Sequence, residues 1–281
     1  MLATNFQIET MQAADVRTAI GWAGQEGWNP GLHDANTFFA ADKSGFFKGV
    51  LNGEIIATGS AVIYDDAYAF CGLYIVAPEH RGKGFGLELT KARLAYCGDR
   101  NVGIDGVLEN VRIYERIGYE AFYENCRYQK AATAVHTAPE IRDIERSDFP
   151  TVKAYDRQCF PASRDAFLTA WLWQPDARAV GFFEDEMLKG YAVRRKCLEG
   201  HKVGPLFADN ADIAATLFDS LQADIEGELI ILDTPENNPE AISLAVSQGM
   251  EKVFATARMY QKGLPALDAG KIFGITTFEL G

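Results

Sequence analysis

The sequence repeats itself weakly at one spacing, and this repetition constrains the fold more than any other feature. Five short segments of the first half have counterparts in the second half, in the same order and at offsets of 127 to 133 residues. α/β proteins reuse similar turns and strands, so each match alone is weak. Their shared order and spacing predict two similar units in tandem. The matches are 6–9 with 139–142, 49–56 with 181–188, 109–110 with 236–237, 117–120 with 248–251, and 127–128 with 259–260.

The repeat predicts units at 1–132 and 137–263, followed by a tail at 264–281. Small residues between 131 and 139 are typical of a linker. Within the first unit, hydrophobic periodicity and turn residues predict helices over 15–24, 86–96 and 111–117, and strands over 46–51, 54–63, 68–76, 102–107 and 122–128. This order predicts a mixed α/β fold in which each unit has a twisted sheet flanked by helices. The β-rich residues 271–280 predict a further strand that returns to one of the sheets, with a frayed terminus as the alternative.

Composition excludes several classes of protein. The net charge of −12 disfavours nucleic acid and anionic membranes as partners and favours cationic ones. No apolar run approaches the roughly 20 residues of a membrane span, and the first residues do not resemble a secretory signal. The five cysteines and four histidines are scattered. We therefore expect no metal site, no disulfide framework and a cytoplasmic location.

A glycine-rich turn is the sharpest local feature. A predicted strand ends at Val76, residues 78–86 (P-E-H-R-G-K-G-F-G) follow, and a predicted helix begins there. Alternating glycines let successive backbone N–H groups face one point at a helix N-terminus, which is a site for anions such as a diphosphate. Arg81 and Lys83 add positive charge. A tight turn that needs glycine only for its backbone is the alternative.

This segment resembles the R/Q-x-x-G-x-G/A acyl-CoA signature of the GNAT N-acetyltransferases, with Arg81, Gly84 and Gly86 in the three fixed places. The resemblance implies that acetyl-CoA is the cosubstrate and that no metal is needed. It also implies that the turn binds the CoA diphosphate while the preceding strand binds the pantetheine arm. The implied contact residues are Tyr74, Ile75, Val76, Arg81, Gly82, Lys83, Gly84, Phe85 and Gly86.

A second stretch, residues 110–119, is similar to the family's N-x-x-x-Y-x-x-x-G-F/Y element. The resemblance implies that Asn110 contacts the cofactor and that Tyr114 protonates the departing thiolate. A tyrosine that only packs on the sheet is the alternative for Tyr114.

The second unit departs from both motifs. Residues 203–210 lack the arginine and the alternating glycines, and Ala245 stands where the repeat places Tyr114. We therefore expect a degenerate GNAT-like unit that shapes the acceptor site or a homodimer.

The sequence leaves the general base and the acceptor unassigned. The loop 25–34 borders the acceptor in the family, so Glu26 and Asp34 are candidates to hold a cationic substrate, and Trp28 is a candidate to stack on it. His33 is a further titratable candidate. Solvated acids and a core tryptophan are the alternatives.

These features predict an N-acetyltransferase that moves acetyl from acetyl-CoA to a primary amine of a small molecule or peptide, by direct attack in a ternary complex. Three alternatives remain. They are an acyltransferase that uses another acyl-CoA or a non-amine acceptor, a non-catalytic acyl-CoA sensor, and an interaction domain without cofactor.

Overall fold

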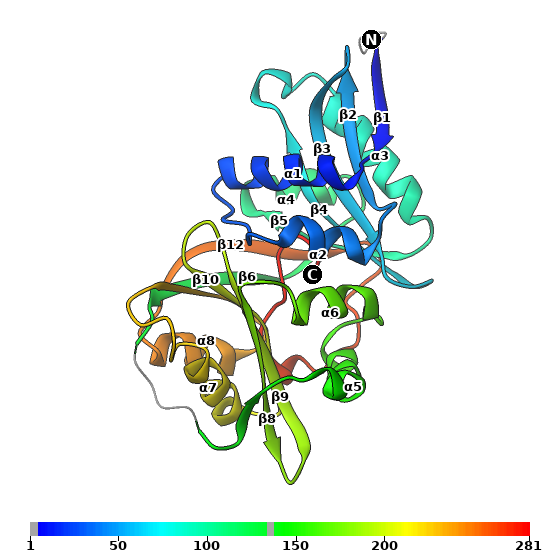
Figure 1. The fold of residues 1–281 in the computed structure, drawn as a ribbon. Helices are drawn as coiled ribbons and strands as arrows, with labels where there is room; N and C mark the ends of the chain where they lie inside the picture. Colours follow the sequence, from blue (N-terminus) through cyan, green and yellow to red (C-terminus); the bar gives the residue numbers. More distant parts are fainter. Residues whose placement is uncertain (1–4, 134–137) are drawn as a thin grey trace.

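The computed structural model describes residues 5–133 and 138–281 and has the mixed α/β architecture that the sequence predicts (Figure 1). Its strands form one 13-stranded sheet in the order β1-β2-β3-β4-β5-β12-β6-β11-β10-β9-β8-β7, with β13 paired to β10. Part of the predicted linker, residues 134–137, lies outside the described residues.

The first half follows the predicted order of elements. The hairpin of β2 and β3 and the strand β4 have the predicted bounds, because Asn52 and Gly53 adopt the positive φ angles, 53° and 88°, of a tight hairpin turn. The elements are β1 (Phe6–Thr10), α1 (Ala13–Gln25), α2 (Asp34–Ala41), β2 (Phe46–Leu51), β3 (Glu54–Ile63), β4 (Tyr68–Val76), η1 (Pro78–His80), α3 (Phe85–Cys97), β5 (Asn101–Val107), η2 (Leu108–Asn110), α4 (Val111–Glu115) and β6 (Glu120–Ala131).

The second half repeats this order and adds a short terminal strand. Its elements are β7 (Ile141–Asp143), η3 (Arg146–Asp148), α5 (Phe149–Cys159), α6 (Asp165–Leu172), β8 (Ala177–Glu184), β9 (Met187–Lys196), β10 (His201–Ala208), α7 (Ala211–Ser220), β11 (Leu229–Pro235), α8 (Pro239–Ser247), β12 (Glu251–Tyr260), η4 (Ala269–Lys271) and β13 (Ile272–Gly274). The predicted tail strand therefore exists, but its paired part is only three residues long.

The halves exchange their last strands. β12 from the second half lies between β5 and β6, whereas β6 from the first half pairs with β11. The two sheets are thereby fused into one. The boundaries 1–132 and 137–263 remain a prediction from the sequence. In the structure, each of these units supplies a strand to the sheet of the other.

The helices cover the sheet in two layers. α1, α2, α5 and α6 pack in one apolar core on one face, where α2 meets α6 and the rings of Phe38 and Trp171 stack 6.2 Å apart. On the opposite face, α3 and α4 cover the first half and α7 and α8 cover the second. In the described part of the chain, no helix is long and apolar enough to cross a membrane.

The C-terminal segment lies inside the molecule. Residues 275–281 follow β13 toward the first half, and the chain end is drawn at the centre of Figure 1, between α2 and α6. Leu280 is buried, and its carbonyl accepts a 2.8 Å hydrogen bond from the Tyr64 hydroxyl. This segment therefore brings residues from the end of the chain close to β4.

Candidate active site

β4 and β5 diverge halfway along their length. Their parallel pairing runs from Tyr68 opposite Asn101 to Cys71 opposite Ile104 and then stops, while β5 continues to pair with β12 as far as Val107. The pairing of β4 with β3 also shifts register here, and Leu73 has a φ of 47°. This bulge turns the end of β4 away from β5 and leaves an opening between the two strands.

The glycine turn lies at the outer end of this opening. Gly82 and Gly84 have φ angles of 73° and 90°, which suit glycine and bend the chain into α3. Gly84 is the N-cap of α3, and no side chain caps this helix. The Leu87 amide donates to the Gly84 carbonyl at 3.1 Å, which leaves the amides of Phe85 and Gly86 to bind an anion, and the helix dipole favours one there.

Arg81 connects this turn to its surroundings. Its Nε donates to the Val76 carbonyl at 2.8 Å, and its Nη2 forms an ion pair with Glu26 at the end of α1. The Arg81 side chain remains half exposed at the turn. Glu26, which the sequence suggests for holding a cationic substrate, is thus placed at the end of the opening that the glycine turn forms. Lys83 is exposed on the same turn.

A cavity of about 930 Å³ runs from the glycine turn along the opening and into the second half. Most of the predicted site residues line it, whereas Lys83, Phe85 and Asp34 do not. The lining residues among those predicted are Tyr74, Ile75, Val76, Arg81, Gly82, Gly84, Gly86, Asn110, Tyr114, Glu26 and Trp28. The Phe85 side chain instead packs on Phe6, with ring centroids 4.8 Å apart.

Tyr114 lies on α4 with its ring against Gly106 of β5, beside the opening. Burial raises the pKa of Tyr114 above its ordinary value, and the Asn110 side chain opposes this shift without cancelling it. The hydroxyl therefore stays protonated at neutral pH, as a proton donor must.

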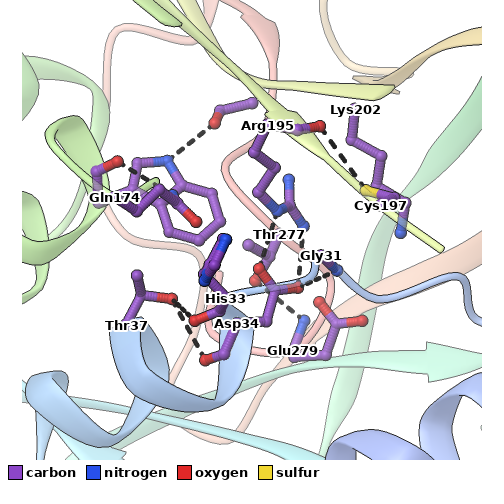
Figure 2. Close-up of polar contacts among 12 residues, drawn as sticks. Gly31, His33, Asp34, Thr37, Gln174, Arg195, Cys197, Lys202, Thr277 and Glu279 are labelled. Carbon is purple, nitrogen blue, oxygen red and sulfur yellow. Dashed lines mark hydrogen bonds and ion pairs between the residues drawn. The ribbon is translucent and has the colours of Figure 1, made fainter. Parts of the chain in front are cut away.

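Asp34 does not line this cavity. Its carboxylate accepts hydrogen bonds from Arg195 Nε at 2.9 Å and from the Gly31 amide at 2.7 Å, and it is only 1% exposed (Figure 2). His33 contacts Asp176 at 2.9 Å. The structure therefore places Asp34 in a buried ion pair between the halves, away from the cavity lining.

The inner end of the cavity contains residues that sequence reasoning missed. β6 contributes Arg127, β12 contributes Phe254, and the C-terminal segment contributes Phe278 and Glu279. Arg127 forms a two-pronged ion pair with Asp233, at 2.7 and 2.8 Å. No local motif marks these residues, because strand exchange and the returning tail bring them together.

A second buried pair supports the wall of the cavity. Asp105 of β5 accepts hydrogen bonds from Arg258 Nε at 2.9 Å and Nη2 at 2.7 Å, and from Asn125 at 2.6 Å. Burial raises the pKa of Asp105, although Arg258 opposes the shift. The side chains that donate these hydrogen bonds lie on β6 and β12. The Asp105 carboxylate therefore links β5 to both exchanged strands.

In its described residues, the second half has no equivalent opening. β10 and β11 also stop pairing, after Val203 opposite Leu232, but β13 pairs with β10 beyond that point and the Ile275 amide donates to the Asp233 carbonyl at 2.9 Å. The chain itself thus fills the space between the two strands.

The helix that follows β10, α7, also differs from α3 in the first half. The Asn210 side chain caps α7 by accepting from the Ile213 amide at 3.0 Å, in contrast to the uncapped α3. Ala245, in the place of Tyr114, is fully buried in α8. In the described residues, no cluster of three or more His, Cys, Asp or Glu side chains is arranged to hold a metal.

Two family models match the chain. A model of the acetyltransferase (GNAT) family matches residues 13–119, and a model of an acetyltransferase (GNAT) domain matches residues 152–274. The chain is 32% identical over 262 residues to holothin acyltransferase of Pseudoalteromonas sp. (strain SANK 73390), covering 92% of this chain and 89% of that one.

Solved structures share the whole fold. A Pyrococcus horikoshii protein assigned to the acetyltransferases has a TM-score of 0.85 at 17% identity and covers 100% of this chain and 98% of its own. A tandem GNAT protein from the clavulanic acid biosynthesis pathway has a TM-score of 0.62 at 14% identity, covering 91% and 98%. With one family model on each half and a relative above 30% identity along nearly its full length, the chain belongs to the GNAT acyltransferase family and contains two GNAT domains in tandem.

Proposed function

We propose that the protein is an acyl-CoA-dependent N-acyltransferase that moves an acetyl group from acetyl-CoA to a primary amine of a small molecule or peptide. The observation that carries this proposal is the opening between β4 and β5, which leads from Gly72 to the uncapped N-terminus of α3. An extended thiol carrier with a diphosphate at one end fits a slot of this shape.

The outer end suits the diphosphate. Free amides of the turn and the dipole of α3 favour a negative group, and Arg81 and Lys83 add positive charge in a chain whose net charge is −12. Beyond Cys71, the edge of β4 that faces β5 has no strand partner in the described residues. Backbone groups of residues 74–76 on this edge are therefore available to the amides of a pantetheine arm, apart from the Val76 carbonyl, which accepts from Arg81 Nε.

Tyr114 is the proposed acid. It lies beside the opening between the glycine turn and the second half, and its raised pKa keeps the hydroxyl protonated. When the C–S bond breaks, the hydroxyl donates its proton to the sulfur. Asn110, which lies one helical turn before it, supports the position of the cofactor and of the hydroxyl.

The second half supplies the proposed acceptor site. Phe254, Phe278 and Ile231 line the inner cavity and provide apolar walls, while Trp28 contributes from the first half. A primary amine with an apolar or aromatic body fits such walls. The acidic chain also favours approach of a cation.

Other acyl donors form a second candidate function. The relative at 32% identity is named an acyltransferase rather than an acetyltransferase, so an acyl group longer than acetyl is a specific alternative. The apolar inner cavity offers room for it.

Two experiments test the proposal. Calorimetry with acetyl-CoA should register heat, and release of free CoA thiol should depend on an added amine when a panel of primary amines is screened. A panel of acyl-CoA donors then ranks the acyl groups. Heat without amine-dependent thiol release would favour a sensor, and the absence of heat would overturn the assignment.

A further inference from the structure

The tail that closes the second half also reaches the first-half cavity, which Phe278 and Glu279 line. Ile275 is anchored on β11 by its bond to Asp233, and Leu280 is anchored by Tyr64. Between them, the Thr277 hydroxyl accepts hydrogen bonds from the amides of Glu279 and Leu280, at 3.2 and 2.9 Å. The tail is therefore held at both ends and in the middle, and the position of Glu279 is fixed.

Glu279 lies where β4 and β5 separate. Its main chain packs so closely on Gly72 that any Cβ on Gly72 would overlap the Glu279 carbonyl. Gly72 is the first residue of β4 beyond the last pair with β5, so it marks the inner end of the opening. Glu279 is one of the residues that line the cavity, and the residue as a whole is 6% exposed. An acyl carrier whose diphosphate lies at the glycine turn would place its reactive end at this point.

The other carboxylates of the cavity wall are occupied or distant. Glu26 forms an ion pair with Arg81 at the outer end, and Asp105 is bonded to Arg258 and Asn125. Glu199 is exposed at the mouth. By contrast, within the described ranges no cationic nitrogen lies within 4.0 Å of the Glu279 carboxylate, whereas three other buried ion pairs have N–O distances of 2.7 to 2.9 Å.

Charged groups of several elements surround Glu279. Arg127 of β6 and Arg195 of β9 are paired with Asp233 and Asp34, respectively, so their charges are balanced locally. Lys202 of β10 is buried and donates to the Trp28 carbonyl at 2.9 Å.

Burial and the neighbouring Arg127 lower the pKa of Lys202, while Glu279 and Asp233 act in the opposite direction. Lys202 thus interacts electrostatically with Glu279 without a bond between the two side chains. A carboxylate that has no side-chain partner among the described residues and lies beside the reacting end of a substrate is the arrangement that a general base requires.

We propose that Glu279 is the base that removes a proton from the acceptor ammonium in the first-half site, an inference that rests on the proposed acyl transfer. The carboxylate takes one proton from R–NH₃⁺, and the neutral amine attacks the thioester carbonyl carbon. A C–N bond forms, and the C–S bond breaks with its electron pair leaving on sulfur.

The remaining protons also balance. Tyr114 protonates the thiolate, the tyrosinate recovers a proton from the amide nitrogen through water, and Glu279 passes its own proton to water. The products are the amide, CoA thiol and one proton. The second half of the chain would thus supply a catalytic group to the first half.

Glu279→Gln tests this role, because it keeps the shape of the side chain and removes its basicity. We expect kcat/KM for the amine to fall about 100-fold at pH 7. The deficit should shrink toward pH 10, where a growing fraction of an alkylamine with a pKa of about 10.4 is already neutral. Acetyl-CoA affinity, measured by calorimetry, should stay within about threefold of the wild type.

Glu251→Gln is the matched control, since Glu251 is an exposed glutamate at the start of β12, away from the cavity lining. It should behave as the wild type at every pH. Glu279→Asp should restore part of the activity at pH 7, because it returns a carboxylate on a shorter arm.

Two results would overturn the role of Glu279 while leaving the acyltransferase assignment intact. One is a Glu279→Gln variant with full activity at pH 7. The other is a loss that is equal at all pH values and accompanied by lost acetyl-CoA binding, which would indicate a structural role. If the wild-type protein transfers no acyl group to any amine, the proposed function and the role of Glu279 fail together.

Discussion

Tyr74 lies directly against Gly86, so that a Cβ on Gly86 would overlap the Tyr74 hydroxyl. The contact joins the unpaired end of β4 to the first turn of α3, which are the two parts of the predicted acyl-CoA site. The third glycine of the turn is therefore required by packing between strand and helix as well as by approach of a ligand.

Gly86→Ala should weaken acetyl-CoA binding at least about tenfold, because the strand and the helix must separate to admit the methyl group. Tyr74→Phe in the same chain should recover part of the affinity by removing the overlapping oxygen. Gly21→Ala on α1 is the control: no atom lies within 4 Å of the added methyl, and it should stabilise the helix by about 0.5–1 kcal/mol. Calorimetry and thermal melts measure these effects, and undiminished affinity in Gly86→Ala would contradict the packing argument.

Tyr114→Phe should lower kcat about 10²- to 10³-fold with little change in acetyl-CoA affinity, since the hydroxyl acts on the leaving thiolate. Because burial raises the pKa of Tyr114, the alkaline decline of the wild-type rate that reports its ionisation should lie above pH 10. Steady-state kinetics across pH, together with calorimetry, test both statements. Equal rates in the variant and the wild type would remove Tyr114 from the reaction.

Asp233→Ala should destabilise the protein by about 3–5 kcal/mol, because it leaves the buried Arg127 charge uncompensated. Replacing both residues with leucine should recover much of that loss. The exposed pair of Glu88 and Lys91 is the comparison, and Glu88→Ala should cost at most about 1 kcal/mol. Urea unfolding measures each variant. Similar losses for Asp233→Ala and Glu88→Ala would show that burial does not amplify the effect of the pair.

His201 should make stability depend on pH in the acidic range. Burial lowers the pKa of His201 below 6.5, and the hydrogen bond with Glu228 only partly offsets this. The unfolded chain therefore binds a proton more readily, so the contribution to stability is complete above pH about 6.5 and is lost as the pH falls through the folded pKa. His201→Gln should flatten that part of the profile. Melting temperatures measured from pH 8 to 5 test this, and parallel profiles would argue against it.

Each chain should bind a single acetyl-CoA, because β13 and Ile275 fill the space between β10 and β11 and the Asn210 side chain caps α7. Calorimetric titration gives the stoichiometry directly. A value of two sites per chain would mean that the tail leaves the second half when ligand binds.

Local signals in the sequence are sufficient to predict the structure where a turn or a motif defines its own backbone geometry. Asn52 and Gly53 fix the hairpin, and Gly82, Gly84 and Gly86 fix the strand–turn–helix unit, so both were predicted at the right positions. The loop 25–34 is expected to lie between two helices, but the sequence does not give the bounds of the second one, α2, which packing of Phe38 on Trp171 stabilises.

Contacts between distant segments could not be predicted in the same way. The acidic Asp34 resembles a substrate-binding residue until Arg195, which belongs to the other half, is placed beside it. The repeat indicates the same order of strands in both halves but does not specify that β6 and β12 change places. Glu279 lies in a tail without a recognisable motif, and only the path of the folded chain brings it to Gly72.

The exchange of β6 and β12 has a consequence for any attempt to produce one half of the chain without the other. A gene cut at the repeat boundary would encode an N-terminal fragment whose β5 has lost its neighbour and whose β6 projects as an unsatisfied edge. Such a fragment would tend to aggregate, even though it carries the whole glycine turn. The second half therefore has a structural role for the first half, because it supplies the strand that lies beside β5.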